Sequence, residues 1–239
     1  MIKVITSKDN KRVKYALSLR ENKNQTQFKQ FLGESLKSLE LAIKANVVKE
    51  VFTYNHLNID ESIEQYLVNE DVMKKLSCSV NPEGVVFIAD IKENRPEQLN
   101  KVLYLDHIND PGNMGTMIRT ALAFNFDAVV VSKDSVSIYN DKVLASCKGA
   151  NYLIPVFHDE LSNYVRTHHI ISSCLDAKAI DMNELEIPHK FVLVMGNEAH
   201  GISSEIRKLT NTFVKIPISN IDSLNVSVAA GILMHHLSK

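Results

Sequence analysis

The stretch Phe191-Val192-Leu193-Val194-Met195-Gly196-Asn197-Glu198 decides the fold class of this chain. Five consecutive apolar residues are followed at once by a glycine, an amide and an acid. An unbroken apolar run of this length is typical of a strand that is buried on both faces, as in parallel sheets covered by helices. Ligands bind at the carboxyl ends of such strands. The stretch therefore predicts a parallel α/β sheet with a candidate site at its edge.

Similar apolar runs continue in both directions from this strand and alternate with helical periodicity. The expected strands are 101–108, 128–132, 154–157, 168–175, 190–195 and 212–218. The expected helices lie near 113–124, 140–148, 159–167, 203–210 and 223–237. This alternation predicts an α/β domain over residues 101–239.

The front of the chain has a different pattern. The spacing of Leu36, Leu39 and Ile43 predicts an amphipathic helix. Strands are expected over 48–54 and 85–89, and further helices near 9–20 and 60–76. The polar segment 93–100 contains Pro96 and has no periodicity, which is typical of a linker. We therefore expect a first domain over residues 1–92.

The composition excludes several classes of protein. The 239 residues are 45% hydrophobic and 23% charged, as in ordinary globular proteins. No apolar run reaches the ~18–20 residues of a membrane span, and residues 1–12 lack the apolar core of a secretion signal. Cys78, Cys147 and Cys174 are an odd number without zinc spacing, and no His-Glu-x-x-His motif occurs. We expect a cytoplasmic protein that needs no metal.

Charge is unevenly distributed along the chain. Residues 1–30 carry eight Lys and Arg side chains against Asp9 and Glu21, although the whole chain has a net charge of −1. A basic stretch of this kind attracts a phosphate backbone without reading its sequence. A solvated helix face explains the same pattern, so charge alone leaves both interpretations open.

A first polar cluster, Asp110–Thr120, follows the strand expected at 101–108. The chain turns at Pro111-Gly112, and Asn113 is the expected N-cap of a helix. Apolar neighbours of Arg119 indicate that this helix is largely buried, where a lone charge needs a partner. The cluster lacks the third glycine of a dinucleotide fingerprint. A helix cap and a ligand site both explain it.

A second cluster, Met195–Ser203, follows the strand that opened this section. Gly196 would let a ligand approach the backbone closely. Glu198 is an acid where an apolar sheet edge does not favour one. The pattern favours a site at the end of this strand.

A third cluster lies over 216–231. A strand breaks at Pro217, and after a polar loop the last helix opens with Ser223 and Asn225. The small residues 229–231 would let this helix approach another element closely. A capped C-terminal helix explains the pattern as well as a site does.

In this order and at these spacings, the three clusters resemble the motifs of the SpoU (TrmH-type) RNA ribose 2′-O-methyltransferases of the SPOUT superfamily. Asn-x-Gly-x-x-x-Arg corresponds to Asn113–Arg119, Gly-Asn-Glu with a following glycine to Gly196–Gly201, and Ser-Leu-Asn-Val-Ser-x-Ala to Ser223–Ala229. The resemblance covers residues 101–239. Residues 1–92 resemble the small ribosomal-protein-like RNA-binding domain that many members carry in front, through 7–14, 31–34 and 81–84.

The resemblance implies an architecture and binding partners. Residues 101–239 would form a five- or six-stranded parallel α/β sheet with a deep trefoil knot, which periodicity alone never suggests because knots are nearly absent from folds. A small α+β RNA-binding domain (1–92) and a linker (93–100) would precede it. The implied cofactor is S-adenosyl-L-methionine, and the implied assembly is a homodimer with composite sites.

The resemblance also implies site residues and a reaction. Cofactor contacts fall on Met195, Gly196, Asn197, Ile216 and Leu224. Catalytic and RNA-contacting roles fall on Asn113, Arg119, Glu198, Ser223 and Asn225. The expected activity is 2′-O-ribose methylation of RNA, with large-subunit rRNA as the expected substrate. A tRNA 2′-O-methyltransferase and a non-catalytic RNA-binding ribosome-assembly factor are the alternatives.

Two positions and one stretch depart from the family pattern. Members often carry arginine where this chain has Ala145, and glycine where it has Asn125. The stretch 21–27 has fewer arginines than is common in members. These departures concern RNA affinity and target identity, since none of them lies in the three motifs.

Overall fold

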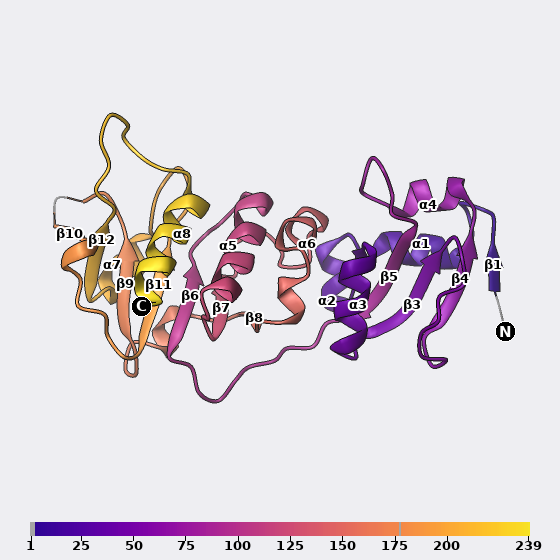
Figure 1. Ribbon diagram of the computed structural model, residues 1–239, viewed down its shortest axis with the longest axis horizontal. Coiled ribbons are helices and arrows are strands. Elements are labelled where there is room, and N and C mark those ends of the chain that lie inside the picture. Colours follow the sequence, from indigo (N-terminus) through magenta and orange to yellow (C-terminus); the bar gives the residue numbers. More distant parts are fainter. Residues whose placement is uncertain (1–2, 177) are drawn as a thin grey trace. The chain divides into compact units, whose positions relative to one another are not determined.

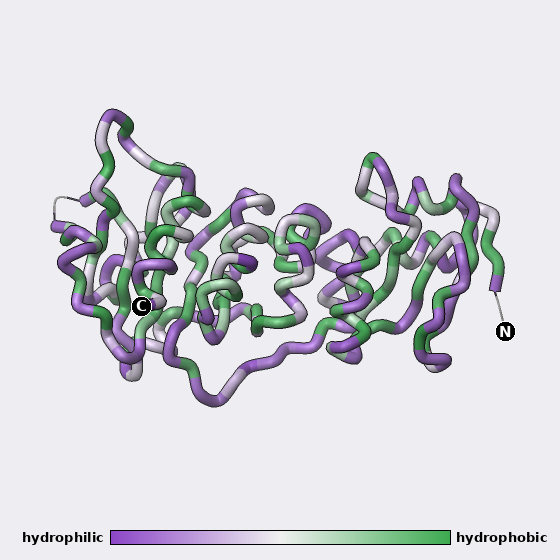
Figure 2. Tube along the Cα trace, viewed as in Figure 1, coloured by the Kyte–Doolittle hydropathy of each residue, from purple (hydrophilic) through white to green (hydrophobic). Residues whose placement is uncertain are grey.

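The computed structural model describes residues 3–176 and 178–239, which form two compact units (Figure 1). Unit 1 comprises the chain up to Lys92 together with Tyr139–Leu153. Unit 2 comprises Glu93–Ile138 and Ile154–Lys239. The segment 93–100 contains no helix or strand and is mostly hydrophilic (Figure 2).

Unit 1 is built on a mixed five-stranded sheet of order β1-β4-β3-β5-β2. Its strands are β1 (Lys3–Ile5), β2 (Gln30–Glu34), β3 (Val48–Thr53), β4 (Glu64–Val68) and β5 (Val85–Asp90). Its helices are α1 (Lys11–Ser18), α2 (Asn22–Phe28), α3 (Leu36–Lys44), α4 (Glu70–Leu76) and α6 (Asp141–Cys147), with a 3-10 turn η1 (Ala150–Tyr152). Strands β1, β4 and β3 are parallel, whereas β5 pairs antiparallel with β3 and β2.

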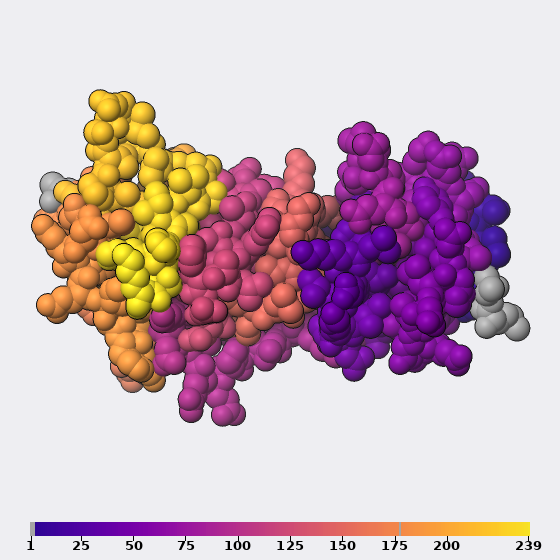
Figure 3. All heavy atoms as spheres, in the orientation of Figure 1, coloured from indigo at the N-terminus to yellow at the C-terminus, as the bar shows by residue number. Residues whose placement is uncertain are grey.

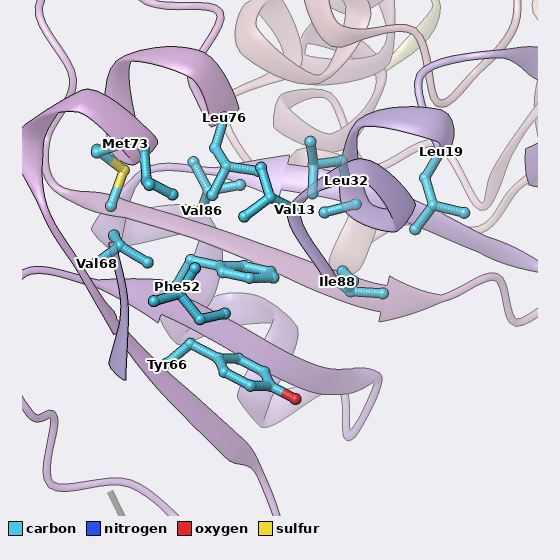
Figure 4. Close-up of a cluster of buried hydrophobic side chains, with 13 residues drawn as sticks. Val13, Leu19, Leu32, Phe52, Tyr66, Val68, Met73, Leu76, Val86 and Ile88 are labelled. Carbon is cyan, nitrogen blue, oxygen red and sulfur yellow. The ribbon is translucent and has the colours of Figure 1, made fainter. Parts of the chain in front are cut away.

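Alternation along β5 explains why both faces of this sheet are covered. Val86 and Ile88 belong to one apolar cluster, with residues of α1 and α4 (Figure 4). Val85, Phe87 and Ala89 belong to another, with residues of α3. Successive side chains of a strand point to opposite faces, so one apolar run supplies two cores. The stacked rings of Phe52 and Tyr66, 5.2 Å apart, extend the first core.

The basic stretch at the front is largely neutralised in the fold. Five of its eight cationic side chains contact carboxylates: Lys3 with Glu64, Lys8 with Asp71, Arg12 with Glu50, Lys14 with Asp9, and Arg20 with Asp141. Within the described residues, Lys11, Lys23 and Lys29 have no ion pair. A solvated, paired surface therefore accounts for most of the charge that the sequence concentrates there.

One expected helical region is confirmed only in part, and one expected helix is wrong. The region 60–76 contains strand β4 before helix α4. The alternation of buried Tyr66 and Val68 with partly exposed neighbours gives β4 one core-facing side, and Asn69 caps α4 by accepting from the Val72 N–H. The region 159–167 contains only a 3-10 turn, η2 (Leu161–Asn163).

Unit 2 confirms the expected parallel α/β sheet. Within the described residues, its sheet has seven strands in the order β10-β12-β9-β11-β6-β7-β8, and all neighbouring strands are parallel. The resemblance implied five or six strands. The strands are β6 (Lys101–Leu105), β7 (Ala128–Val131), β8 (Val156–His158), β9 (His169–Ser173), β10 (Ile180–Asp181), β11 (Phe191–Met195) and β12 (Thr212–Lys215). The helices are α5 (Pro111–Ala123), α7 (Ser204–Leu209) and α8 (Val226–Leu237), with a 3-10 turn η3 (Met182–Glu184).

The order of the strands reverses beside β6. The chain adds β7 and β8 on one side of β6 and then crosses to the other side, where β11 lies next to β6. Ligands bind where the strand order reverses in this way. Ile206 of α7 and the preceding Ile202 pack into the apolar cluster on one face of the sheet, while α5 and α8 pack against each other and contact β7 and β11. Among the described helices, none is long and apolar enough to cross a bilayer.

Asn125 shows why one departure from the family pattern is tolerated. Its φ of 56° lies in the left-handed region, in the turn between α5 and β7. Glycine adopts this conformation freely, and asparagine is several-fold enriched there among other residues. The replacement of glycine by asparagine therefore preserves the turn.

Ser35 is held in a more strained conformation and yields a stability prediction. With φ 87° and ψ 146°, it lies in a region used almost only by glycine, at a cost of ~1–3 kcal/mol. Its hydroxyl caps α3 by accepting from the Ser38 N–H, and replacing such a cap by glycine costs only a few tenths of a kcal/mol. Ser35→Gly should raise the free energy of unfolding by ~1 kcal/mol, measured by urea denaturation.

Ser38→Gly is the matched control, because Ser38 is an interior residue of the same helix. Glycine there should lower the free energy of unfolding by ~0.5 kcal/mol. A loss of stability in Ser35→Gly as large as that in Ser38→Gly would contradict strain at Ser35.

Candidate active site

A cavity of about 680 Å³ lies in unit 2 where several parallel strands end. Strands β9, β11 and β12 end at Ser173, Met195 and Lys215, and all three residues line it. The segment between β12 and α8 also lines it and projects from the unit (Figure 3). The cavity therefore occupies the carboxyl edge of the sheet, as expected from the apolar strand over 191–195.

Eight of the ten expected site residues line this cavity. They are Met195, Gly196, Asn197, Glu198, Ile216, Ser223, Leu224 and Asn225. The lining also includes residues to which the sequence analysis assigned no role: Ser173, Cys174, Leu175, Ala199, His200, Gly201, Arg207, Lys215, Ile218, Asp222, Val226 and Ala229. Asn113 and Arg119 are not part of the lining.

A chain of hydrogen bonds joins the three motifs. The Asn113 amide donates to Glu198 Oε1 at 3.1 Å, and the Asn225 amide donates to Asn113 Oδ1 at 3.1 Å. Asn113 thus links residues 85 and 112 positions away in sequence. Although Asn113 is outside the lining, it orients two side chains that belong to it.

Two helices begin at the site, and the N-cap residue of one of them, α5, is not the expected one. Helix α5 begins at Pro111, and Asp110 is its N-cap, accepting from the Asn113 N–H at 2.7 Å. The expectation that Asn113 is the cap is therefore wrong, and its side chain remains available for Glu198 and Asn225. Asn225 is the N-cap of α8 and accepts from the Ser227 and Val228 N–H groups.

Gly196 is required for a reason other than the expected one. A Cβ at this position would lie 2.4 Å from the Gly201 carbonyl carbon and 2.4 Å from the Ile202 nitrogen. Real Cβ atoms essentially never approach backbone so closely, and backbone atoms cannot move aside as a flexible side chain can. The missing side chain therefore makes room for the chain itself at the edge of the cavity.

Arg119 is exposed, which contradicts the expectation of a largely buried charge. Apolar neighbours such as Met117 and Ile118 are fully buried, but Arg119 lies on the solvent side of α5. Within the described residues, its guanidinium meets no carboxylate. The side chain is therefore free to contact a substrate.

The loop over 197–203 is held by a buried carboxylate that sequence reasoning did not select. Asp106, directly after β6, accepts from the Ser203 N–H at 2.7 Å and contacts the His107 imidazole at 2.7 Å. Burial, followed by the nearby Asp106 charge, raises the pKa of the Tyr104 hydroxyl to about 12. The signal in the sequence was an acid directly after an apolar strand, the same signal that selected Glu198.

Two cationic side chains lie at the cavity. Lys215 and Arg207 both line it. Arg207 donates to Asp176 at 3.2 Å, and the hydrogen bonds from the Lys178 backbone and from Arg207 lower the pKa of Asp176. The lining thus combines apolar side chains with backbone and charged groups.

The small residues of α8 serve packing within the chain. Ala230 is fully buried, and Ala229 lines the cavity. A Cβ at Gly231 would lie 3.8 Å from the Thr120 side chain of α5, an ordinary contact. Ala229 and Ala230 are therefore occupied by contacts within the chain, Gly231 has room for a side chain, and none of the three gives a separate indication of a homodimer.

The cavity fits a nucleoside-containing sulfonium cofactor in size and in chemistry. Its volume lies within the ~300–1,000 Å³ of small-molecule sites. Apolar walls from Ile216, Leu224 and Val226 suit a base, while the edge at Gly196 and Asn197 offers backbone and amide groups. Four of these five residues, Gly196, Asn197, Ile216 and Leu224, are among those that the resemblance assigned to the cofactor.

Comparisons with known proteins cover both units. Residues 100–235 match the SpoU rRNA Methylase family, and residues 10–86 match the MRM3-like substrate binding domain. The chain is 31% identical to a protein of Bacillus subtilis named 23S rRNA (guanosine(2553)-2'-O)-methyltransferase RlmP, over 99% of each chain.

Solved structures share the whole fold. The rRNA methyltransferase of Sinorhizobium meliloti with bound AdoMet superposes with a TM-score of 0.88 at 24% identity, covering 99% of this chain and 97% of that one. A structure described as an RNA 2'-O ribose methyltransferase has a TM-score of 0.80 at 26% identity, covering 98% and 97%.

Proposed function

Because this chain belongs to the SpoU rRNA methylase family, we propose that it methylates a ribose 2′-hydroxyl of large-subunit rRNA with S-adenosylmethionine as methyl donor. The chain is an RNA 2′-O-methyltransferase by family. The observation that carries the choice of substrate is the full-length similarity to a 23S rRNA methyltransferase. The observation that carries the site is the hydrogen-bonded chain Asn225–Asn113–Glu198 at the cavity.

The cavity at the ends of β9, β11 and β12 is the proposed cofactor site. S-adenosylmethionine, when bound, supplies an activated methyl group. Met195, Gly196, Asn197, Ile216 and Leu224 would hold it, because all five line the same cavity. The apolar walls exclude water from the bound group, and no residue of the chain has to react covalently.

The difficult part of the reaction is the poor nucleophilicity of a ribose hydroxyl. Positioning and local electrostatics must therefore supply most of the acceleration. A guanidinium gives up its proton only above pH ~12, so Arg119 is a poor general base. We assign it instead to the target phosphate or hydroxyl, where its charge stabilises the developing alkoxide.

The remaining motif residues orient the substrate and one another. Glu198 accepts from Asn113, and Asn113 accepts from Asn225, so a shift of one side chain moves the others. Ser223 shapes the cavity wall beside Leu224. Since Arg119 lies outside the cavity lining of its own chain, we propose a homodimer with composite sites, in which Arg119 of one copy serves the cavity of the other.

Residues 1–92 are the proposed RNA-binding domain, joined by 93–100 to the methyltransferase domain over 101–239. The match of residues 10–86 to a substrate binding domain supports this assignment. Lys11, Lys23 and Lys29 are candidates for phosphate contacts, because they are exposed and carry no ion pair within the described residues. A ribosomal substrate also implies a cytoplasmic location.

The test is methyl transfer in vitro to defined RNAs. Full-length protein with S-adenosylmethionine should methylate large-subunit rRNA from cells that lack this protein, at one ribose, and leave tRNA unmodified. The modified ribose is located by its resistance to alkaline hydrolysis, since a 2′-O-methyl group removes the nucleophile that cleaves the adjacent phosphodiester.

Two other results would favour the alternatives. Methylation of tRNA without rRNA would make the protein a tRNA 2′-O-methyltransferase. Tight RNA binding without any methyl transfer, in the presence of bound cofactor, would make it a non-catalytic assembly factor.

A further inference from the structure

Asp106 is a buried carboxylate to which the proposed reaction gives no role. It is 1% exposed and directly follows β6. Its backbone N–H donates to the Met195 carbonyl at 2.9 Å, which continues the pairing of β6 with β11. Burial of a charged side chain is costly unless its oxygens are hydrogen-bonded. The hydrogen bonds to the Asp106 carboxylate therefore offset the cost of its burial.

The two carboxylate oxygens accept from groups that are far apart in sequence. Oδ1 accepts from His107 Nδ1 at 2.7 Å, and Oδ2 accepts from the Ser203 backbone N–H at 2.7 Å. Ser203 closes the loop over 197–203 and caps α7. Asp106 thus fastens the far end of this loop to the carboxyl end of β6.

The near end of the loop is fastened to the neighbouring residue. The Asn197 amide donates to the His107 carbonyl at 2.8 Å. His107 has a left-handed φ of 54°, and its N–H donates to the Ser132 hydroxyl. In this conformation the His107 carbonyl meets Asn197 while its ring meets Asp106. Both ends of the loop are therefore anchored to two consecutive residues.

Between these anchors the loop presents the motif acid. Asn197 and Gly201 exchange two backbone hydrogen bonds of 2.9 Å, and Asn197 Oδ1 accepts from the Ala199 and His200 N–H groups. Glu198 projects from this compact loop to within 3.1 Å of the Asn113 amide. The place of Glu198 is therefore determined by how the loop is anchored.

We propose that Asp106 is a positioning residue for methyl transfer, which holds the 197–203 loop so that Glu198 stays beside Asn113 at the cavity. The role rests on the proposed function of this cavity. This role differs from a purely structural one. Loss of the Asp106 carboxylate should displace the loop and slow the reaction while the rest of the fold persists.

Asp106→Asn tests the proposal in the full-length protein, because asparagine keeps the shape but can accept at only one of the two positions. We expect kcat to fall about tenfold, with the KM for RNA within about twofold of the native value. Without RNA or cofactor, the amides of Ala199, His200 and Gly201 should exchange with deuterium about tenfold faster.

Asp127→Asn is the matched control, because the Asp127 carboxylate binds the backbone at the opposite end of β6. Asp127 Oδ2 accepts from the Asn100 and Lys101 backbone N–H groups at 2.6 and 2.9 Å. This variant should lose stability while keeping the native kcat and the native exchange in the 197–203 loop. Equal losses of kcat in both variants would assign Asp106 to general stability and overturn the proposal.

Ser203 offers a second test if Asp106→Asn does not fold. Its φ of −64° suits proline, which lacks the N–H that Asp106 accepts. Ser203→Ala keeps this N–H and loses only the hydroxyl that caps α7, whereas Ser203→Pro loses both the N–H and the hydroxyl. Ser203→Pro should therefore lower kcat and speed exchange in the loop, whereas Ser203→Ala should do neither.

The two readouts separate this inference from the proposed function. Native exchange rates and native kcat in Asp106→Asn and Ser203→Pro would overturn the positioning role. Faster exchange with unchanged kcat would overturn it too, since the loop would then move without consequence. Inactivity of the native protein on RNA would count against the proposed function, while the exchange measurement would still report whether Asp106 holds the loop.

Discussion

Arg119→Ala is expected to lower kcat for methyl transfer by ~10²–10³-fold while the affinity for the cofactor stays within a few-fold. The guanidinium is exposed, has no carboxylate partner among the described residues and lies outside the cavity lining, so its removal leaves the cavity and the fold intact. Steady-state kinetics give kcat, and calorimetry with the demethylated cofactor gives the affinity. Near-normal turnover would show that Arg119 does not stabilise the reacting hydroxyl.

Two further variants refine this result. Arg119→Lys keeps the charge but not the planar fork, so it should recover little activity if Arg119 holds a phosphate or hydroxyl through paired N–H groups. Mixing Arg119→Ala with Glu198→Gln tests composite sites. In a randomly exchanged homodimer, about a quarter of the sites would then carry neither change, and that share of activity should return. No recovery would place both residues in the site of one chain.

Gly196→Ala is expected to have the largest effect on the cavity and on stability together. The added Cβ would lie 2.4 Å from backbone atoms of Gly201 and Ile202, so the strand end and the loop must separate. Overpacking of this kind costs ~3 kcal/mol of folding free energy. Because both segments edge the cavity, affinity for the cofactor should also fall at least about tenfold.

Gly231→Ala is the control for this substitution. Its Cβ would make an ordinary 3.8 Å contact with Thr120, inside helix α8. Alanine is the better helix former, so this variant should gain ~0.5–1 kcal/mol and keep native cofactor affinity. Thermal unfolding and calorimetry on both variants decide the matter. Equal stability of Gly196→Ala and the native protein would mean that the backbone approach at Gly196 is not needed.

Local patterns predicted the parts of this protein that depend on short stretches of chain. The apolar run over 191–195 forms the buried strand β11 of a parallel sheet. The side chains of such a run point alternately to both faces of the sheet, so both faces have to be covered to remove them from water. Helix α3 was predicted from the spacing of Leu36, Leu39 and Ile43. The errors occurred where the pattern was ambiguous. The short segment 64–68 is too brief for period alone to separate a strand from a helix.

Motif resemblance selected residues that the fold brings together, because the motifs follow strands whose ends meet at one sheet edge. Eight of the ten expected residues line one cavity. The knot and the homodimer that the resemblance implies remain predictions, as do the catalytic roles. The two exceptions, Asn113 and Arg119, are both on α5, and their surroundings depend on how that helix packs against α8.

The sequence by itself determined the class of the sheet through its apolar periodicity, and the resemblance of three motifs to a known family supplied the family and the residues to suspect. Only the tertiary structure decided how those residues act. The exposure of Arg119 depends on which face of α5 the other elements cover. The need for Gly196 comes from backbone that folds back on it, and the link from Asp106 to Ser203 joins residues 97 positions apart. Such contacts leave no local pattern, because each forms between segments that meet only after the sheet has assembled.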